Sequence, residues 1–269
     1  MLIFKAVILG IVQGLTEFLP ISSSGHLVIT SELLNFHHEG ITFEIFLHLG
    51  SLCAVLLVYR RDLLLMIRSL FTSSTIRQAD PVLGESFRWN FYIVLATLPA
   101  VVVGLFLKDK IDAIFDNILV TFSMLFITGV LMIFTRRLSE KATALAPANS
   151  LIIGTAQAMA ILPGLSRSGC TIFVGLLLGL KRETAARFSF IMSIPAILGA
   201  VVLDMRDLID STPSVEEFSF IFAGTIASAI SGYFAIILLL KIVRRGRLDW
   251  FGYYCFLVSG SGFIWYFLD

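Results

Sequence analysis

Six long apolar segments constrain the fold of this chain more than any other feature. A helix needs about 20 mainly apolar residues to cross roughly 30 Å of hydrocarbon. Mean hydropathy is +0.92, and only 14% of the 269 residues are charged, well below the roughly 25% of soluble domains. We therefore expect an all-α integral membrane protein with spans near residues 41–59, 89–107, 118–134, 185–203, 218–240 and 250–268.

Two further apolar runs are too short to cross a membrane. As helices, residues 26–34 would rise only about 14 Å and residues 171–180 about 15 Å. We interpret residues 1–34 and 148–180 as re-entrant helix-loop-helix hairpins, which enter the membrane and return. Irregular backbone cannot face lipid with unpaired peptide groups, so the polar bends should be buried in protein or line a wet cavity.

An internal repeat relates the two hairpins. A shift of 144 residues, without a gap, aligns Gly10, Gln13, Ser22, Ser24 and Gly25 with Gly154, Gln157, Ser166, Ser168 and Gly169. Three spans follow each hairpin, so the halves, about 1–135 and 145–269, should lie in opposite orientations. We predict a single polytopic domain, residues 1–269, in which the two bends face each other near the bilayer midplane.

Charges in the connecting loops predict the orientation, because Lys and Arg concentrate in cytoplasmic loops. Fifteen of the 20 basic residues lie in loops that share one side if the hairpins return. We therefore expect both termini on the extracytoplasmic side, with the site open to it. The loops on that side carry Asp109, Asp112, Asp116, Asp204, Asp207, Asp210, Glu216 and Glu217.

The first bend gathers polar side chains that are unusual in so apolar a chain. Gln13 and Glu17 are spaced i, i+4 and therefore project from one helical face. Serines occupy positions 22–24, and Gly25 lets the backbone turn into a helix that starts near His26. The pattern brings a carboxylate, hydroxyls and an imidazole to the start of a helix.

The second bend supplies a permanent cation. Ser166, Arg167 and Ser168 precede Gly169 and Thr171. Helix N-termini and guanidinium forks both favour phosphate, and a charge at the bilayer centre costs about 2.5–3.5 kcal/mol on insertion scales. We therefore predict a phosphate site between the bends. The alternative is an Arg167–Glu17 ion pair that only joins the two halves.

Other polar residues give weaker signals. Glu44 and His48 share a helical face and could assist the bends or form a metal-ligand pair, although a hydrogen-bonded buried histidine is the favoured interpretation of His48. Cys53, Cys170 and Cys255 lie in apolar or motif segments, so we expect no disulfide framework.

Two motifs resemble those of the bacterial undecaprenyl-diphosphate phosphatase family of the BacA type. One is an E/Q-x-x-x-E element, Gln13 to Glu17 within QGLTEFLPISSSGHL, and the other is PGLSRSGCT at residues 163–171. Length, span count and motif order agree across essentially the whole chain. The resemblance implies an inner-membrane hydrolase that removes the terminal phosphate of a C55 isoprenoid diphosphate at the outer face. Such an enzyme recycles the carrier lipid for peptidoglycan synthesis and affects bacitracin sensitivity.

The resemblance also implies roles for individual residues. Glu17 would bind a divalent cation, Mg²⁺ or Ca²⁺, or assist proton transfer, and Gln13 stands where the motif allows a second acidic ligand. Ser23 would be the nucleophile and His26 its acid/base partner, while attack by a water that His26 activates is equally compatible with the sequence. Arg167 would hold the diphosphate, and the substrate-binding set would be Gln13, Ser22, Ser24, Ser166, Ser168 and Thr171.

Rival functions stay open at this point. Inverted repeats with midplane hairpins also describe transporters, so the same residues could move a lipid phosphate of the same carrier without breaking a bond. The other rival is a protein that assembles with partners and catalyses no reaction.

The expected ligands are a polyprenyl diphosphate and membrane lipids. The net charge of +1 gives no indication of nucleic-acid binding, and we expect none, while a homodimer is left open.

Overall fold

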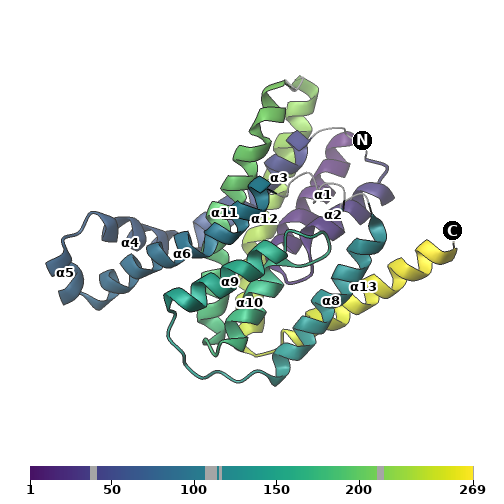
Figure 1. Ribbon diagram of the computed structural model, residues 1–269. Coiled ribbons are helices and arrows are strands. Elements are labelled where there is room, and N and C mark those ends of the chain that lie inside the picture. Colours follow the sequence, from purple (N-terminus) through teal and green to yellow (C-terminus); the bar gives the residue numbers. More distant parts are fainter. Residues whose placement is uncertain (37–40, 107–113, 115–116, 211–214, 269) are drawn as a thin grey trace.

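The computed structural model describes residues 1–36, 41–106, 114, 117–210 and 215–268, without the side chains of residues 41, 203–210, 215 and 216. Within these ranges the chain is helical and contains no strand (Figure 1). The elements are α1 (Leu2–Phe18), α2 (Ser23–Leu33), α3 (Ile41–Val58), α4 (Arg60–Leu70), α5 (Ser74–Ala79), α6 (Pro81–Phe106), α8 (Ile118–Phe134), η1 (Thr135–Arg137), α9 (Pro147–Met159), α10 (Arg167–Leu177), α11 (Arg182–Asp210), α12 (Val215–Arg244) and α13 (Asp249–Leu268).

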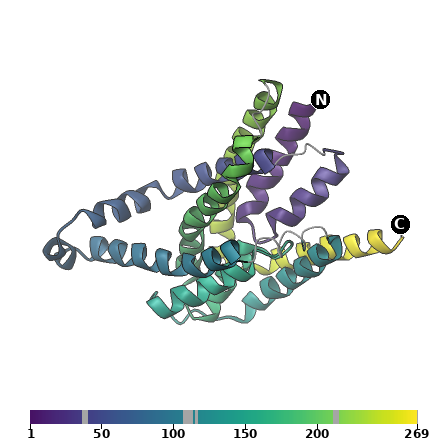
Figure 2. The ribbon, with the colours of Figure 1, turned by 45° about the horizontal axis from the view of Figure 1, so that its top comes forward.

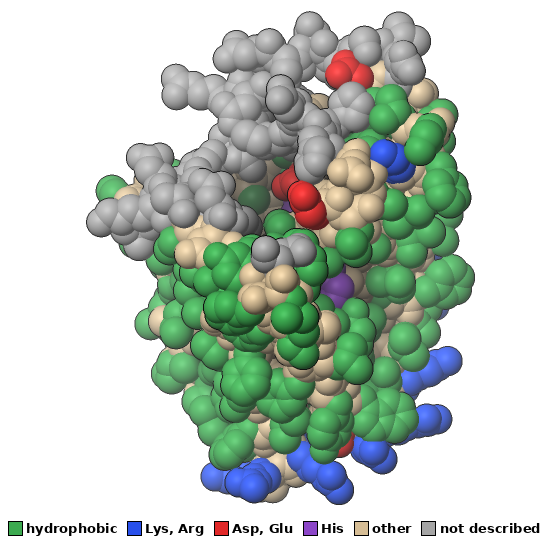
Figure 3. Space-filling model, turned by 90° about the vertical axis from the view of Figure 1, so that its right-hand side faces the viewer, with side chains coloured by type: hydrophobic (Ala, Val, Ile, Leu, Met, Phe, Trp, Pro, Cys, Tyr) green, Lys and Arg blue, Asp and Glu red, His purple; other side chains and the backbone are tan. Residues whose placement is uncertain are grey.

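All six predicted spans are helices, and the protein is a multi-pass membrane protein. Five of them, α6, α8, α11, α12 and α13, are long and apolar enough to cross a bilayer on their own. The sixth, α3, qualifies together with α4, to which it is joined by a bend of 78°. Hydrophobic side chains cover most of the face shown in Figure 3, and Lys and Arg gather at its lower end.

Helix α6 starts well before the predicted residue 89 because the polar segment that precedes it is also helical. Together with α4 and α5, its first half forms an arm that projects from the bundle in both ribbon views (Figures 1 and 2). Pro99 and Pro195 lie inside α6 and α11, which continue through them as single helices.

Both predicted hairpins have the expected helix-loop-helix form. Helices α1 and α2 make the first, and α9 and α10 the second. Helix α2 spans 23–33 and α10 spans 167–177, so the repeat shift of 144 residues relates both of their ends. The internal sequence repeat is therefore also a repeat of local structure.

Glycines allow the first helix of each hairpin to pack closely on a span from the other half of the chain. Helix α1 lies along α12, and α9 lies along α6. A Cβ at Gly10 would overlap the carbonyl oxygen of Gly224, and one at Gly154 would overlap that of Ala96. Small residues at such contacts let membrane helices approach closely and gain van der Waals contact.

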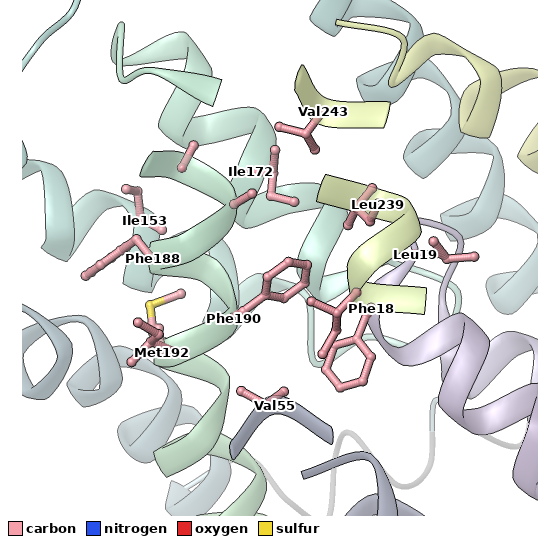
Figure 4. Close-up of a cluster of buried hydrophobic side chains, with 14 of the residues drawn as sticks. Phe18, Leu19, Val55, Ile153, Ile172, Phe188, Phe190, Met192, Leu239 and Val243 are labelled. Atoms are coloured by element: carbon pink, nitrogen blue, oxygen red, sulfur yellow. The ribbon is translucent and has the colours of Figure 1, made fainter. Parts of the chain in front are cut away.

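The main core lies directly beneath the first bend. Phe18 of α1 points toward Phe190 of α11, and their rings meet edge to face with centroids 5.7 Å apart (Figure 4). Val55 of α3 and Leu239 of α12 complete the packing around this pair. Aromatic pairs of this kind add about 0.5–1.5 kcal/mol to the burial of their area. The core thus fixes the end of α1, where Glu17 is located.

Most of the acidic loop residues on which the predicted orientation depends lie outside the described side chains. These are Asp109, Asp112, Asp116, Asp204, Asp207, Asp210 and Glu216.

Candidate active site between the two bends

Each bend is built by the same set of hydrogen bonds at a helix start. The Oγ of Ser22 accepts from the backbone N–H of Gly25 at 3.4 Å, and the Oγ of Ser166 accepts from Gly169 N at 3.2 Å. In both bends the capping serine also contacts the serine two residues later, with Oγ–Oγ distances of 3.2 Å. Serine is a preferred N-cap because its side chain satisfies a free N–H of the first turn.

The structure brings the two bends together. Ser168 of the second bend donates its hydroxyl to the carbonyl oxygen of Leu19 in the first, at 3.3 Å. Gly164 has a φ of +87° and lies so close to Thr121 of α8 that a Cβ would overlap the threonine carbonyl. Only glycine combines this backbone conformation with so close an approach.

Glu17 lies at the centre of the contact and is only 7% exposed. Its Oε1 accepts from Arg167 Nη2 at 2.5 Å. Its Oε2 accepts from Ser23 Oγ at 2.7 Å and from Gln13 Nε2 at 3.0 Å. Three donors from both bends therefore converge on one buried carboxylate.

A cavity of about 290 Å³ opens beside this carboxylate. One part of its wall is polar, and another part is apolar and comes from α3 and α11. The polar part consists of Thr16, Glu17, Ser22, Ser23, Ser24, His48, Ser166 and Arg167, and the apolar part includes Ile45, Ala196, Ile197, Ala200 and Val201. The cavity is therefore suited to a molecule with a polar head and an apolar body.

Arg167 has spare hydrogen-bonding capacity in this cavity. One terminal nitrogen, Nη2, is paired with Glu17, while Nη1 is buried and has no hydrogen-bond acceptor in the described part of the chain. Buried donors are nearly always satisfied in native proteins, so an unpaired one requires an explanation. Arg167 can thus bind Glu17 and still donate to an anionic ligand.

Three of the predicted substrate-binding residues lie behind the cavity wall. Gln13, Ser168 and Thr171 are almost fully buried and are not among the residues that line the cavity. The hydroxyl of Thr171 is 3.2 Å or less from Arg167 O, Ser168 O and Ser189 Oγ. We conclude that these side chains hold the bends in shape, whereas Ser22, Ser24 and Ser166 reach the cavity.

The structure does not bring His26 to Ser23 as expected. The Nδ1 of His26 donates to the carbonyl oxygen of Ser22 at 2.8 Å, so Nε2 accepts from the hydroxyl of Tyr254 at 2.8 Å. The two rings are also stacked, with centroids 5.5 Å apart. The reason is geometric, because the turn of α2 directs Ser23 toward Glu17 and His26 toward α13.

Ser22 adopts an unfavourable backbone conformation, with φ +70°. For a residue with a side chain this region costs on the order of 1–3 kcal/mol, and such residues cluster at active sites and ligand clamps. The strain is offset by the contacts of its Oγ and its carbonyl oxygen with α2.

Sequence reasoning missed two residues that support the bends. Thr128 of α8 donates to Gly164 O at 3.1 Å and accepts from Ser166 N at 3.0 Å. Tyr254 of α13 holds His26. A lone threonine or tyrosine in an apolar span carries no signal of such a role.

Glu44 and His48, which were predicted to share a helical face, border different cavities. Glu44 borders a separate small cavity with Leu9 and Leu27.

The donor set at the site limits how a metal ion could be held. Among the described residues, no group of three or more His, Cys, Asp and Glu side chains could form a metal cage. Among the side chains that the structure describes, Glu17 is the only carboxylate that borders the cavity. However, Gln13 Oε1 is a buried oxygen without a hydrogen-bond donor in the described ranges. Two oxygen ligands suit Mg²⁺ or Ca²⁺ where the substrate supplies the others.

Fold and site together define a polytopic membrane protein with an internal polar site between two helical hairpins. A profile of the family described as bacitracin resistance protein BacA matches residues 6–261. The chain belongs to this family.

Several relatives are similar over nearly their whole length. The chain is 40% identical over 271 residues to an undecaprenyl-diphosphatase of Methanobrevibacter smithii, covering 96% of this chain and 95% of the relative. It is 40% identical over 261 residues to an undecaprenyl-diphosphatase of Halothermothrix orenii, with the same coverage. Undecaprenyl-diphosphatase 1 of Shouchella clausii is 41% identical over 270 residues, covering 98% of this chain and 96% of the relative.

Proposed function

We propose that this protein is an undecaprenyl-diphosphate phosphatase. It hydrolyses the terminal phosphate of a C55 isoprenoid diphosphate to give undecaprenyl phosphate and inorganic phosphate, and so recycles the carrier lipid for peptidoglycan synthesis. Membership of the BacA family and the names of the relatives support this activity. The family description supports a contribution to bacitracin resistance.

One observation carries the proposal. Arg167 borders a cavity with Glu17 and Ser23, and its Nη1 has no hydrogen-bond acceptor in the described ranges. Arginine binds phosphate oxygens through paired N–H groups. The diphosphate would lie against the bends, and the first isoprene units would lie against Ile45, Ile197 and the other apolar residues of the wall.

Ser23 acts as the nucleophile in this proposal, and Glu17 replaces His26 as its proton acceptor. The 2.7 Å hydrogen bond from Ser23 Oγ to Glu17 Oε2 supports this pairing. Ser23 Oγ attacks the terminal phosphorus and forms an O–P bond, while the bond from that phosphorus to the bridging oxygen breaks. The hydroxyl proton moves to Glu17, and the isoprenyl monophosphate leaves with the bridging oxygen.

Water completes the reaction. The water attacks the phosphorus of the phosphoserine, and its hydroxyl group stays on the phosphorus. The bond to the Ser23 oxygen breaks, and that oxygen takes up the remaining proton of the water. Inorganic phosphate is released, and Glu17 returns its proton to water. Arg167 stabilises the negative charge on the phosphoryl oxygens in both steps. The proton goes to Glu17 Oε2, so Oε1 still accepts from Arg167 Nη2 and keeps the guanidinium in place.

The other predicted site residues either bind the phosphate groups or hold the bends in shape. Ser22, Ser24 and Ser166 present hydroxyls to the cavity and bind phosphate oxygens. Gln13, Ser168 and Thr171 keep the bends in shape. His26 holds the strained turn at Ser22 through its hydrogen bond to the carbonyl oxygen of that residue.

A divalent cation, Mg²⁺ or Ca²⁺, belongs to the proposal. Glu17, which borders the cavity, would hold it, and the diphosphate would supply other oxygens. Gln13 would act as the second ligand only by turning its unpaired Oε1 from behind the cavity wall toward the ion. When bound, such an ion neutralises part of the negative charge of the diphosphate.

The proposed membrane arrangement is an inverted repeat of two re-entrant hairpins and six spans, with one repeat in each half of the single domain. The common register of α2 and α10 and the matching hydrogen bonds of their capping serines support the repeat. Lys and Arg at one end of the molecule support a cytoplasmic location for that end (Figure 3). Both termini and the mouth of the site would then be extracytoplasmic, in the bacterial inner membrane.

The test is phosphate release from an isoprenoid diphosphate by the purified protein in detergent, with and without a chelator. The wild type should release phosphate, and Arg167→Ala should abolish the release while the protein still unfolds cooperatively. Wild-type turnover by Arg167→Ala would remove Arg167 from the site. If liposomes with the wild-type protein move a labelled lipid phosphate between leaflets but release no phosphate, the protein is a transporter instead.

A further inference from the structure

His48 reaches the same cavity from a helix outside both bends. It lies in the middle of α3, and its side chain is 36% exposed although the residues around the bends are mostly buried. Its ring lines the cavity with Glu17, Ser23 and Arg167. His48 is not among the aligned positions of the repeat or in the two motifs, and the mechanism above gives it no role.

The amide of Gln13 determines which nitrogen of His48 carries the hydrogen. Gln13 Nε2 is 3.0 Å from Glu17 Oε2 and 2.9 Å from His48 Nδ1. The opposite amide orientation would place the amide oxygen against the carboxylate oxygen, which is repulsive. The NH₂ group must therefore face both partners and give one hydrogen to each, so Nδ1 of His48 is an acceptor and the ring hydrogen is on Nε2.

This arrangement leaves the Nε2–H donor of His48 free, on a side chain that lines the cavity. The structure gives His48 Nε2 no hydrogen-bond partner among the residues it describes, while Nδ1 is held on the buried side by Gln13. Arg167 lines the same cavity, and its buried Nη1 is a second donor without a partner among the described residues. Two donors from different helices, beside hydroxyls that can also donate, form a set that can surround a tetrahedral oxyanion.

We infer that His48 is a substrate-binding residue, whose Nε2–H donates a hydrogen bond to a non-bridging oxygen of the terminal phosphate. The inference rests on the proposed function and adds a phosphate ligand from α3. Gln13 has the supporting part, because its amide fixes the ring and the position of the ring hydrogen.

Two substitutions separate this role from a structural one. The amide group of asparagine can take the place of Nδ1, so His48→Asn keeps an acceptor for Gln13 and removes the donor at Nε2. Glutamine reaches the position of Nε2, so His48→Gln restores a donor there. The control is Glu44→Gln, one helical turn earlier in α3, whose side chain is exposed and does not line this cavity.

The experiment measures kcat and KM for a short-chain isoprenoid diphosphate, and the Kd of its non-hydrolysable methylene-bisphosphonate analogue by calorimetry. His48→Asn should raise both KM and Kd by about 10- to 100-fold, as expected for a lost hydrogen bond to a charged group, with kcat nearly unchanged. His48→Gln should recover most of the affinity. Glu44→Gln should match the wild type, and all variants should keep their thermal unfolding midpoint.

Unchanged KM and Kd in His48→Asn would overturn the inference. So would a change in the Mg²⁺ concentration needed for half-maximal activity at constant substrate Kd, because the ring would then bind the ion. If only His48→Gln were impaired, with a lower unfolding midpoint, the role of the ring would be structural. Failure of the proposed function is distinguishable, because the wild-type protein would then release no phosphate whatever the residue at position 48.

Discussion

Glu17 and Arg167 lie 150 residues apart in the chain and meet with 2.5 Å between Oε1 and Nη2. One comes from the last turn of α1, the other from the first residue of α10, and both are largely buried. The pair therefore joins the two bends at the cavity. Because Arg167 Nη1 has no partner in the described ranges, the pair differs from a purely structural ion pair, in which both charges are fully satisfied.

Replacing Glu17 by Gln should affect both stability and activity. Removal of one partner leaves the buried Arg167 uncompensated, which costs about 3–5 kcal/mol, and it also removes the proton acceptor of Ser23. We expect phosphate release to fall by about 100-fold or more and the thermal unfolding midpoint to fall. Glu32→Gln, on an exposed part of α2, is the control and should change neither. A fully active Glu17→Gln enzyme would contradict the proposed mechanism.

Ser23→Ala should lose activity but remain folded. Within the described residues the hydroxyl makes one hydrogen bond, to Glu17, so its removal changes little packing. With ³²P-labelled substrate and an acid quench, the wild type should yield labelled protein whose phosphate is mapped to Ser23, and the variant should yield none. An active Ser23→Ala enzyme would instead indicate direct attack by water.

Gly14→Ala should weaken the contact between α1 and α12. A Cβ at this position would overlap Ser231 Oγ and the carbonyl oxygen of Ser228, so we expect a destabilisation of about 1–3 kcal/mol from overpacking. Gly260→Ala in α13 is the matched control, since no atom of the described residues lies within 4 Å of its added Cβ. Thermal unfolding in detergent should show a lower midpoint for the first variant and an equal or slightly higher one for the second, because alanine favours helix.

Tyr254→Phe should have a small effect if His26 only positions the turn at Ser22. The phenyl ring keeps the stacking with His26 and loses the 2.8 Å hydrogen bond, which contributes about 0.5–1.5 kcal/mol. Activity should fall by no more than about tenfold, with the pH profile unchanged. A shift of that profile, measured by phosphate release from pH 5 to 9, would restore an acid/base role to His26.

A cysteine at Arg77, in the arm formed by α4, α5 and α6, should be labelled from the cytoplasmic side. The background is a variant with Cys53, Cys170 and Cys255 replaced by serine. In inside-out vesicles a membrane-impermeant maleimide should modify the new cysteine, and in right-side-out vesicles it should not. The reverse result would contradict the predicted orientation of both termini.

The sequence by itself was sufficient to predict the long apolar helices, the two helix-loop-helix hairpins and the residues in their bends. Length and hydropathy are sufficient to predict the long apolar helices. The repeat of 144 residues relates both ends of α2 to those of α10, but the two helices start at Ser23 and Arg167, a few residues before the predicted positions near His26 and Thr171. The N-caps at Ser22 and Ser166 are local as well, since each needs only an N–H three residues further on.

Only the tertiary structure decided which of these side chains reach the cavity and which distant residues join them. In a membrane protein the lipid-facing and core-facing sides of a helix are both apolar, so periodicity does not reveal which side meets another helix. For this reason the partnership of His26 with Tyr254, 228 residues away, could not be inferred, and the free side of the His48 ring was not evident. Both depend on how α13 and α3 are rotated against the hairpins, which is a property of packing rather than of local pattern.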